Sequence, residues 1–152
     1  MATHLQEGEK APLFTGVDQN GNKVSLKDLR GKKVVLYFYP EDDTPTCTVQ
    51  ACNLRDNYSA LKAQGYEVVG ISPNDEVSHQ KFKEKYNLPF TLIADPQHKI
   101  IDKYGVWGEK TLYGRTYMGL HRTTFVIDEK GTIKQIILRP NSKTHAEEIL
   151  QH

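Results

Sequence analysis

Two cysteines, five residues apart, are the residues of this sequence best suited to covalent chemistry. Cys47 and Cys52 are the only cysteines among the 152 residues. A cysteine reacts as its thiolate, which is favoured by neighbouring positive charge and by the N-terminus of a helix. Two thiols this close in sequence indicate redox chemistry, half of a metal site, or a chance pair of buried side chains.

Cys47 lies where a buried strand gives way to a helix. The run Val34–Tyr39 is apolar throughout, which is typical of a strand buried on both faces, and Pro40 ends it. From Thr46 to Gln64, apolar residues recur at helical spacing. Cys47 is thus predicted in the first turn of a helix, where unpaired N–H groups and the helix dipole stabilise an anion. Such a position lowers the pKa of a cysteine thiol below its ordinary value of about 8.5.

Attack on a peroxide also needs groups that orient and polarise the O–O bond. The hydroxyl of Thr44 stands three residues before Cys47 and can hydrogen-bond a peroxide oxygen. Pro40 would stiffen the loop and help to shield the site from water. Arg122 precedes a predicted strand and can bring a fixed positive charge to the same edge of the sheet.

Each of these residues also has a simpler interpretation. Cys52 can be core packing, Arg122 a surface ion pair, and Thr44 a helix cap. The acidic run Glu41–Asp43 is expected to be a solvated loop whose charge opposes thiolate formation. No histidine has a partner at metal-ligand spacing, so no metal site is predicted, and His121 is expected to be a surface residue. The six histidines are His4, His79, His98, His121, His145 and His152.

Strands and helices alternate along the chain, which predicts an α/β fold with a central mixed sheet flanked by helices. Hairpins are expected around Asn20-Gly21, as an N-terminal extension, and around Glu129-Lys130-Gly131. The stretch Gly105–Gly119 has no clear period and is expected to be a long loop. The remaining expected elements are strands Tyr66–Ser72 and Thr91–Ala94 and helices from Asn74 or Asp75 to Tyr86, Pro96 to Tyr104 and Thr144 onward. One domain, residues 1–152, holds them all. The order fits a thioredoxin-like fold, and another three-layer fold stays open.

The segment Pro40-x-x-x-Thr44-x-x-Cys47 resembles the active-site signature of the peroxiredoxins. The spacing Cys47-x-x-x-x-Cys52 resembles their Q-type subgroup, also called bacterioferritin comigratory proteins. Segments similar to the same subgroup are Gly31–Pro40, Val69–Ser72, Tyr104–Trp107 and Arg122–Asp128, and the similarity extends from about Gly8 to Leu150. Thr46 departs from the pattern, because glycine is expected there, and it can alter loop flexibility and rate.

The resemblance implies a thioredoxin-like fold and the reduction of hydrogen peroxide and organic hydroperoxides. Cys47 would be the peroxidatic nucleophile, and Thr44 and Arg122 would orient and polarise the peroxide. Pro40 would shield the pocket, and Cys52 would resolve the sulfenic acid by forming an intramolecular disulfide. Thioredoxin would then reduce the disulfide in a monomeric protein that requires no metal, flavin or haem.

Two other functions stay open at this point. If Cys52 is structural, the chain is a one-cysteine peroxidase that glutathione or glutaredoxin recycles. The same fold can also serve as a redox-sensing or chaperone-like binding protein without useful turnover.

Charge and hydropathy exclude several classes of partner. Lys and Arg number 20 and Asp and Glu 19, so a net charge of +1 leaves no excess to bind nucleic acid or an anionic membrane surface. No apolar run approaches the ~20 residues of a membrane helix. The N-terminus lacks the basic and apolar regions of a secretory signal, which indicates a cytoplasmic protein.

The spacing of the cysteines also has a mechanical consequence. On one regular helix, five residues give ~7.5 Å of rise and a Cα separation of roughly 8–9 Å. A disulfide needs ~4.4–6.8 Å between Cα atoms. The first turns of the helix are therefore predicted to unwind before Cys47 and Cys52 can bond.

Overall fold

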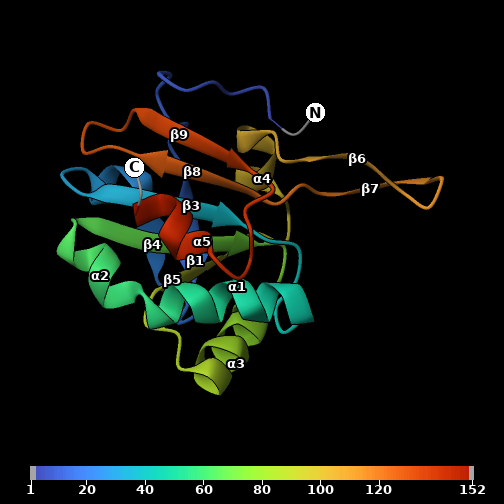
Figure 1. Cartoon of the computed structure of the whole chain (residues 1–152), viewed down its shortest axis with the longest axis horizontal. Helices are drawn as coiled ribbons and strands as arrows, with labels where there is room; N and C mark the ends of the chain where they lie inside the picture. Colours follow the sequence, from blue (N-terminus) through green and yellow to red (C-terminus); the bar gives the residue numbers. More distant parts are fainter. Residues whose placement is uncertain (1–2, 151–152) are drawn as a thin grey trace.

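A seven-stranded mixed sheet forms the centre of the protein, which a computed structural model describes over residues 3–150 (Figure 1). Its strands lie in the order β2-β1-β5-β4-β3-β8-β9. Their bounds are β1 (Thr15–Asp18), β2 (Lys23–Ser25), β3 (Lys33–Phe38), β4 (Tyr66–Ser72), β5 (Thr91–Ala94), β8 (Thr123–Ile127) and β9 (Ile133–Leu138). Strands β3, β4 and β5 are parallel, and β8 runs antiparallel to β3. The predicted mixed sheet is therefore confirmed, as are the hairpins β1–β2 and β8–β9.

Helices cover both faces of the sheet. They are α1 (Pro45–Asp56), α2 (Tyr58–Ala63), α3 (Glu76–Tyr86), α4 (Lys99–Tyr104) and α5 (His145–Leu150), with a short 3-10 turn at Leu26–Leu29. The helix predicted from Thr46 to Gln64 is divided at Asn57, which separates α1 from α2. No helix within residues 3–150 is long and apolar enough to cross a membrane.

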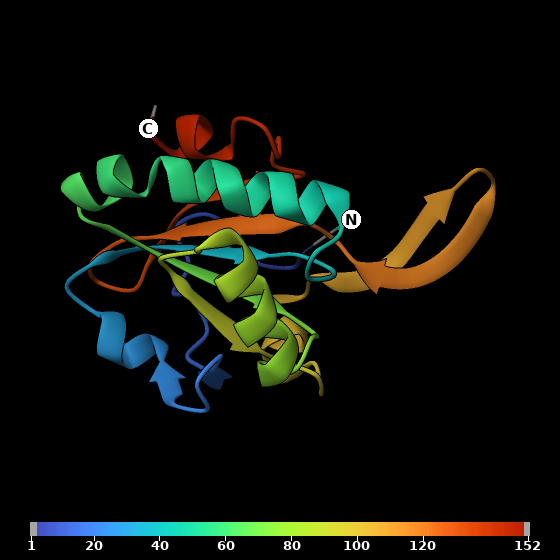
Figure 2. The same cartoon turned by 90° about the horizontal axis from the view of Figure 1, so that it is seen from below.

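The alternation of side chains along β3 divides the core into two layers. Val35, Tyr37 and Tyr39 face a layer built with α1, α2, α3 and α5. Leu36 and Phe38 face the opposite layer, which contains α4. Helices α1 and α5 lie next to each other on the same side of the sheet (Figure 2). Helix α5 is thus packed against the helix that carries both cysteines.

The stretch predicted as a long loop is instead a second, two-stranded sheet. Strands β6 (Trp107–Leu112) and β7 (Arg115–Leu120) pair antiparallel and project from the body of the protein (Figures 1 and 2). Tyr113 and Gly114 form the turn, with φ of 51° and 76°. Both values are left-handed, as a tight two-residue hairpin turn requires. The prediction was wrong because the first four residues of β7 are exposed and show no alternation of apolar and polar side chains.

Candidate active site

Cys47 lies in the first turn of α1, directly after the loop that follows β3. Thr44 is the N-cap residue and Pro45 the first helical residue, so Cys47 occupies the third helical position. The amide of Thr48 donates to the carbonyl of Thr44 at 2.8 Å, which is the first bond of the helix. Cys47 is a free thiol and only 1% exposed. The predicted position at a helix N-terminus is confirmed, and the site is sheltered from bulk water.

Arg122 supplies the positive charge next to the sulfur. Its Nη2 donates to Sγ of Cys47 at 3.1 Å, and its Nη1 donates to Oε1 of Gln50 at 3.3 Å. The sheet explains this contact: Thr123, the first residue of β8, pairs with Phe38, the last residue of β3. Arg122 therefore lies next to the carboxyl end of β3. A guanidinium at this distance can stabilise negative charge that develops at the site, so Arg122 is not a surface ion pair.

Thr44 and Pro40 lie in the loop before Cys47, and both are half-buried. The hydroxyl of Thr44 donates to the carbonyl of Glu41 at 3.1 Å and makes no side-chain cap of α1. Its oxygen keeps a free lone pair that can accept a hydrogen bond from a hydroperoxide. Pro40 stands where the chain leaves β3, four residues before Thr44.

Cys52 lies on the same helix as Cys47 and is also a free thiol, half-buried. Helix α1 is continuous from Pro45 to Asp56, so the two residues are five positions apart on one regular helix. At this spacing the Cα atoms are roughly 8–9 Å apart, which is too far for a disulfide. A bond between the two sulfurs therefore requires a change in the backbone of α1.

The acidic loop is not wholly solvated, contrary to the prediction. The side chain of Asp42 is only 4% exposed and contacts Nδ1 of His79 at 2.7 Å. It also accepts hydrogen bonds from the hydroxyls of Tyr39 and Ser78. The other nitrogen of His79 faces the carbonyl of Ile93 at 3.0 Å. Both ring nitrogens of His79 thus face oxygen atoms of the surrounding protein.

Only part of the acidic run behaves as expected. Glu41 is exposed. Asp43 accepts hydrogen bonds from Lys85 and Tyr86 at the surface, both at 2.7 Å, and these bonds hold the pKa of its carboxyl below the ordinary value. Asp42 therefore fixes the loop to α3 through buried contacts, and Asp43 contacts the same helix at the protein surface.

Three buried polar side chains near Cys47 were not predicted from the sequence. Gln50 is 1% exposed, and His145 is fully buried. Burial lowers the pKa of His145 to about 4. Tyr37 is also buried, and burial, followed by the proximity of Cys47, raises the pKa of its phenol well above the ordinary value. The predicted buried strand Val34–Tyr39 accounts for the burial of Tyr37, but it did not indicate that Tyr37 lies near Cys47.

Two of the remaining histidines lie at the base of the projecting hairpin. The ring of His98 packs against Trp107, with centroids 4.4 Å apart. His121 contacts the carbonyl of Glu109 through Nε2 at 3.1 Å and is half-buried, so it is tied to the hairpin. His152 lies outside the described residues. Within residues 3–150, no three or more His, Cys, Asp or Glu side chains are grouped so that they could hold a metal ion.

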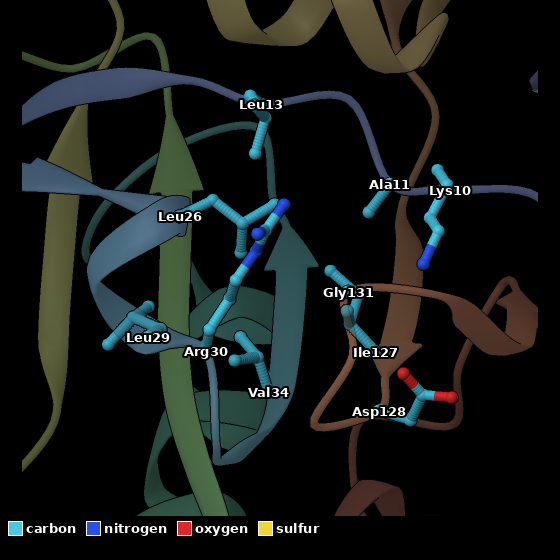
Figure 3. A pocket seen from close by; sticks show the side chains of 10 residues that line it. All are labelled: Lys10, Ala11, Leu13, Leu26, Leu29, Arg30, Val34, Ile127, Asp128 and Gly131. Atoms are coloured by element: carbon cyan, nitrogen blue, oxygen red, sulfur yellow. The ribbon is translucent and has the colours of Figure 1, made fainter.

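An apolar cavity of about 290 Å³ lies beside the start of β3 (Figure 3). Its walls include Ala11, Leu26, Val34 and Ile127. Val34 belongs to the first residues of β3 and Ile127 is the last residue of β8, whereas Cys47 follows the opposite end of β3. This cavity is therefore at the opposite end of β3 from Cys47 and is not the site of thiol chemistry.

Comparison with known proteins places this site in a family. The model of the AhpC/TSA family matches residues 8–136. A putative peroxiredoxin bcp of Coxiella burnetii is 47% identical over 96% of this chain and 97% of its own length. Peroxiredoxin Bcp of Escherichia coli K12 is 44% identical over 96% of this chain and 94% of its own length.

Solved structures agree with the sequence relatives. The crystal structure of peroxidoxin BcpB from Mycobacterium tuberculosis matches with a TM-score of 0.86 and 32% identity, over 97% of this chain and 96% of that one. A structure of Xanthomonas campestris peroxiredoxin Q matches with a TM-score of 0.85 and 27% identity, over 91% of this chain and 87% of that one. The fold is therefore thioredoxin-like, as predicted. The chain belongs to the AhpC/TSA family, among the Bcp peroxiredoxins, which are thiol-dependent peroxidases.

Proposed function

We propose that Cys47 reduces hydroperoxides and that Cys52 resolves the product within the same chain. The observation that carries the proposal is the 3.1 Å contact between Arg122 and the sulfur of Cys47, at the N-terminus of α1. One domain, residues 1–152, would suffice for the whole cycle as a monomer, because the resolving cysteine is on the same helix.

The first step is a displacement at oxygen. The thiolate of Cys47 attacks one oxygen of the hydroperoxide, the O–O bond breaks, and the second oxygen leaves as an alkoxide or hydroxide that takes a proton from water. Arg122 stabilises the charge that develops on the leaving oxygen. Thr44 accepts a hydrogen bond from the hydroperoxide and orients it, and Pro40 shields the loop from water. The cysteine becomes a sulfenic acid.

The second step closes the disulfide. The thiol of Cys52 attacks the sulfenic sulfur of Cys47, and the hydroxyl leaves as water. The first turns of α1 unwind for this step, because a regular helix holds the two residues too far apart. An external dithiol then reduces the disulfide by two exchange reactions, through a mixed disulfide.

Thioredoxin is the proposed reductant, and the cytoplasm the proposed location. Two cysteines in 152 residues are too few for the disulfide scaffold of a small secreted protein, which suits a compartment where thiols are kept reduced. For the substrate, the related Xanthomonas campestris bacterioferritin comigratory protein, 26% identical over 91% of this chain, is described as having alkyl peroxide reduction activity. Organic hydroperoxides and hydrogen peroxide are the proposed substrates here.

The Cys52→Ser variant tests the resolving role. After one equivalent of peroxide, mass spectrometry of this variant should show sulfenic acid at Cys47 and no intramolecular disulfide. The first peroxide step should change less than about twofold, and turnover with thioredoxin should fall on the order of 100-fold. Unchanged turnover would show that Cys52 is structural and favour a one-cysteine cycle.

The Cys47→Ser variant is the matched control, and it should consume no peroxide. A wild-type rate no faster than that of a free thiol at the same pH would favour the redox-sensing or binding role instead.

A further inference from the structure

A chain of buried polar contacts runs from the active site to the last helix. Beyond Cys47 and Arg122 it continues from Nε2 of Gln50 to Nδ1 of His145, at 3.2 Å. Nε2 of His145 then contacts the hydroxyl of Thr124 at 2.9 Å. Gln50 is on α1, His145 opens α5, and Thr124 is on β8. Three elements distant in sequence therefore meet behind the guanidinium of Arg122.

The direction of each hydrogen bond follows from its partners. A guanidinium has donors only, so the atom of Gln50 that faces Arg122 must be its carbonyl oxygen. The amide NH₂ of Gln50 then points at Nδ1 of His145, which must present a lone pair. The ring proton is therefore on Nε2 and is donated to Thr124. His145 is neutral in this arrangement, which agrees with the lowered pKa that its burial produces.

We propose that His145 is a positioning residue that fixes the orientation of Gln50 and, through it, the guanidinium of Arg122 at Cys47. The proposal rests on the proposed function, because the effect is on the thiol's reaction with peroxide. A glutamine amide can present either its oxygen or its NH₂ group to a neighbour, and because the two groups are similar in size, packing does not distinguish them. Arg122 requires the oxygen on its side, and the lone pair on Nδ1 of His145 accepts from the NH₂ group and so holds the amide in that orientation.

Loss of this lone pair has a defined consequence. Without an acceptor at Nδ1, the NH₂ group of Gln50 has lost its partner, and the side chain of Gln50 is held by Arg122 alone. The Gln50 side chain is then free to shift, and the guanidinium bonded to it can leave the position that the 3.1 Å contact with Cys47 requires. Misplacement of about 1 Å near reacting atoms can cost up to 100-fold in rate.

Two substitutions at one position separate positioning from packing. His145→Leu removes both nitrogens, whereas His145→Asn keeps an oxygen close to where Nδ1 stands. We expect H145L to react with peroxide about tenfold more slowly than wild type, and H145N to stay within about threefold of wild type. The measurement is a single-turnover stopped-flow experiment on the reduced protein with hydrogen peroxide. Thermal unfolding of both variants records any loss of stability separately.

A double-mutant cycle with Arg122 distinguishes a positioning role of His145 from a purely structural role. In the Arg122→Met background, H145L should have no further effect on the peroxide rate, because the group that it positions is absent. Additive effects, or H145L at the wild-type rate, would overturn the proposal. If wild type itself reacts no faster than a free thiol, the proposed function fails instead.

A second pair of variants covers the case in which H145L does not fold. His145→Gln keeps a polar group near Thr124 but none at the position of Nδ1. H145Q should then be as slow as expected for H145L, while H145N remains close to wild type. Equal rates for H145Q and H145N would count against an acceptor at Nδ1 as the deciding group.

Discussion

Cys47 is held from two sides, and the two supports differ in kind. On the N-terminal side, Asp42 fixes the loop to α3 through a buried contact with His79 at 2.7 Å, together with two hydroxyl donors. On the C-terminal side, Gln50 on α1 and His145 on α5 are joined by a hydrogen bond between uncharged groups. A buried carboxylate is costly to leave without its partners, because it is then an uncompensated charge. Hydrogen bonds between neutral groups are weaker and can be exchanged.

The difference matches what the two sides have to do in the proposed cycle. The loop with Thr44 must keep its shape while peroxide binds and reacts. The helix between Cys47 and Cys52 must open each time the disulfide forms, and Gln50 lies inside that segment. The strong support is thus on the part that stays in place, and the exchangeable support is on the part that moves.

The largest effect is expected when the N-terminal support is broken. Asp42→Ala leaves His79 buried beside Ile93 without its carboxylate, so the free energy of unfolding should fall by about 3–5 kcal/mol. Urea unfolding at pH 7 measures this loss. Asp43→Asn is the matched control, because Asp43 pairs with Lys85 at the surface and asparagine tolerates its left-handed φ of 59°. It should leave the stability nearly unchanged. Equal losses in both variants would show that the buried contact is no anchor.

A smaller effect is expected when the C-terminal support is titrated. Burial lowers the pKa of His145 from 6.5 to about 4, so the unfolded chain takes up a proton more readily than the folded protein. The stability that neutral His145 contributes is complete above about pH 6.5 and is lost as the pH falls toward about 4.

Between pH 7 and pH 4.5, the wild type should lose about 2–3 kcal/mol more than H145N in urea unfolding. From pH 7 to pH 8.5 the two proteins should change in parallel, since His145 is neutral in both states there. If H145N lost as much stability as the wild type between pH 7 and pH 4.5, groups other than His145 would be responsible for the loss.

The smallest effect concerns the helix that must open. Val49 lies between the two cysteines and is 41% exposed, so it can be changed with little effect on the core. Alanine stabilises a helix by about 1 kcal/mol relative to glycine. Val49→Gly should therefore form the disulfide about fivefold faster than Val49→Ala, with an unchanged first step, in rapid-quench mass spectrometry after one equivalent of peroxide.

The matched pair for this experiment is Ser59→Gly and Ser59→Ala. Ser59 is exposed on α2, outside the segment between the cysteines. These two variants should form the disulfide at the same rate. A difference as large as that at Val49 would mean that opening is not local to the first turns of α1.

The sequence was sufficient for the features that depend on local pattern and chain order. The apolar run of β3, followed by a proline and a helical repeat, placed Cys47 in the first turn of α1. Arg122 could be assigned to the same edge because it stands directly before a strand. These predictions succeeded because each rests on neighbours in the chain.

The features that failed depend on contacts between distant residues. Asp42 looks like its acidic neighbours, and its partner His79 is 37 residues further on. Gln50 and His145 are 95 residues apart, so nothing local distinguishes the latter from a surface histidine. The β6–β7 hairpin was missed because its turn places a tyrosine, Tyr113, at a positive φ, where asparagine or glycine is the usual signal.

The place of α5 at the end of the chain bears on how the protein is made. Ribosomes deliver a chain N-terminus first, so Thr44, Cys47 and Arg122 have all emerged before residue 145. Helix α5 has six residues and is too short to be stable alone; the amide of Ala146 donates to the side chain of Asn53 on α1 at 2.7 Å. A nascent or C-terminally clipped chain would hold every reacting group but lack the histidine that aims them. Full reactivity toward oxidants would thus be acquired only after α5 has been made and has packed against α1.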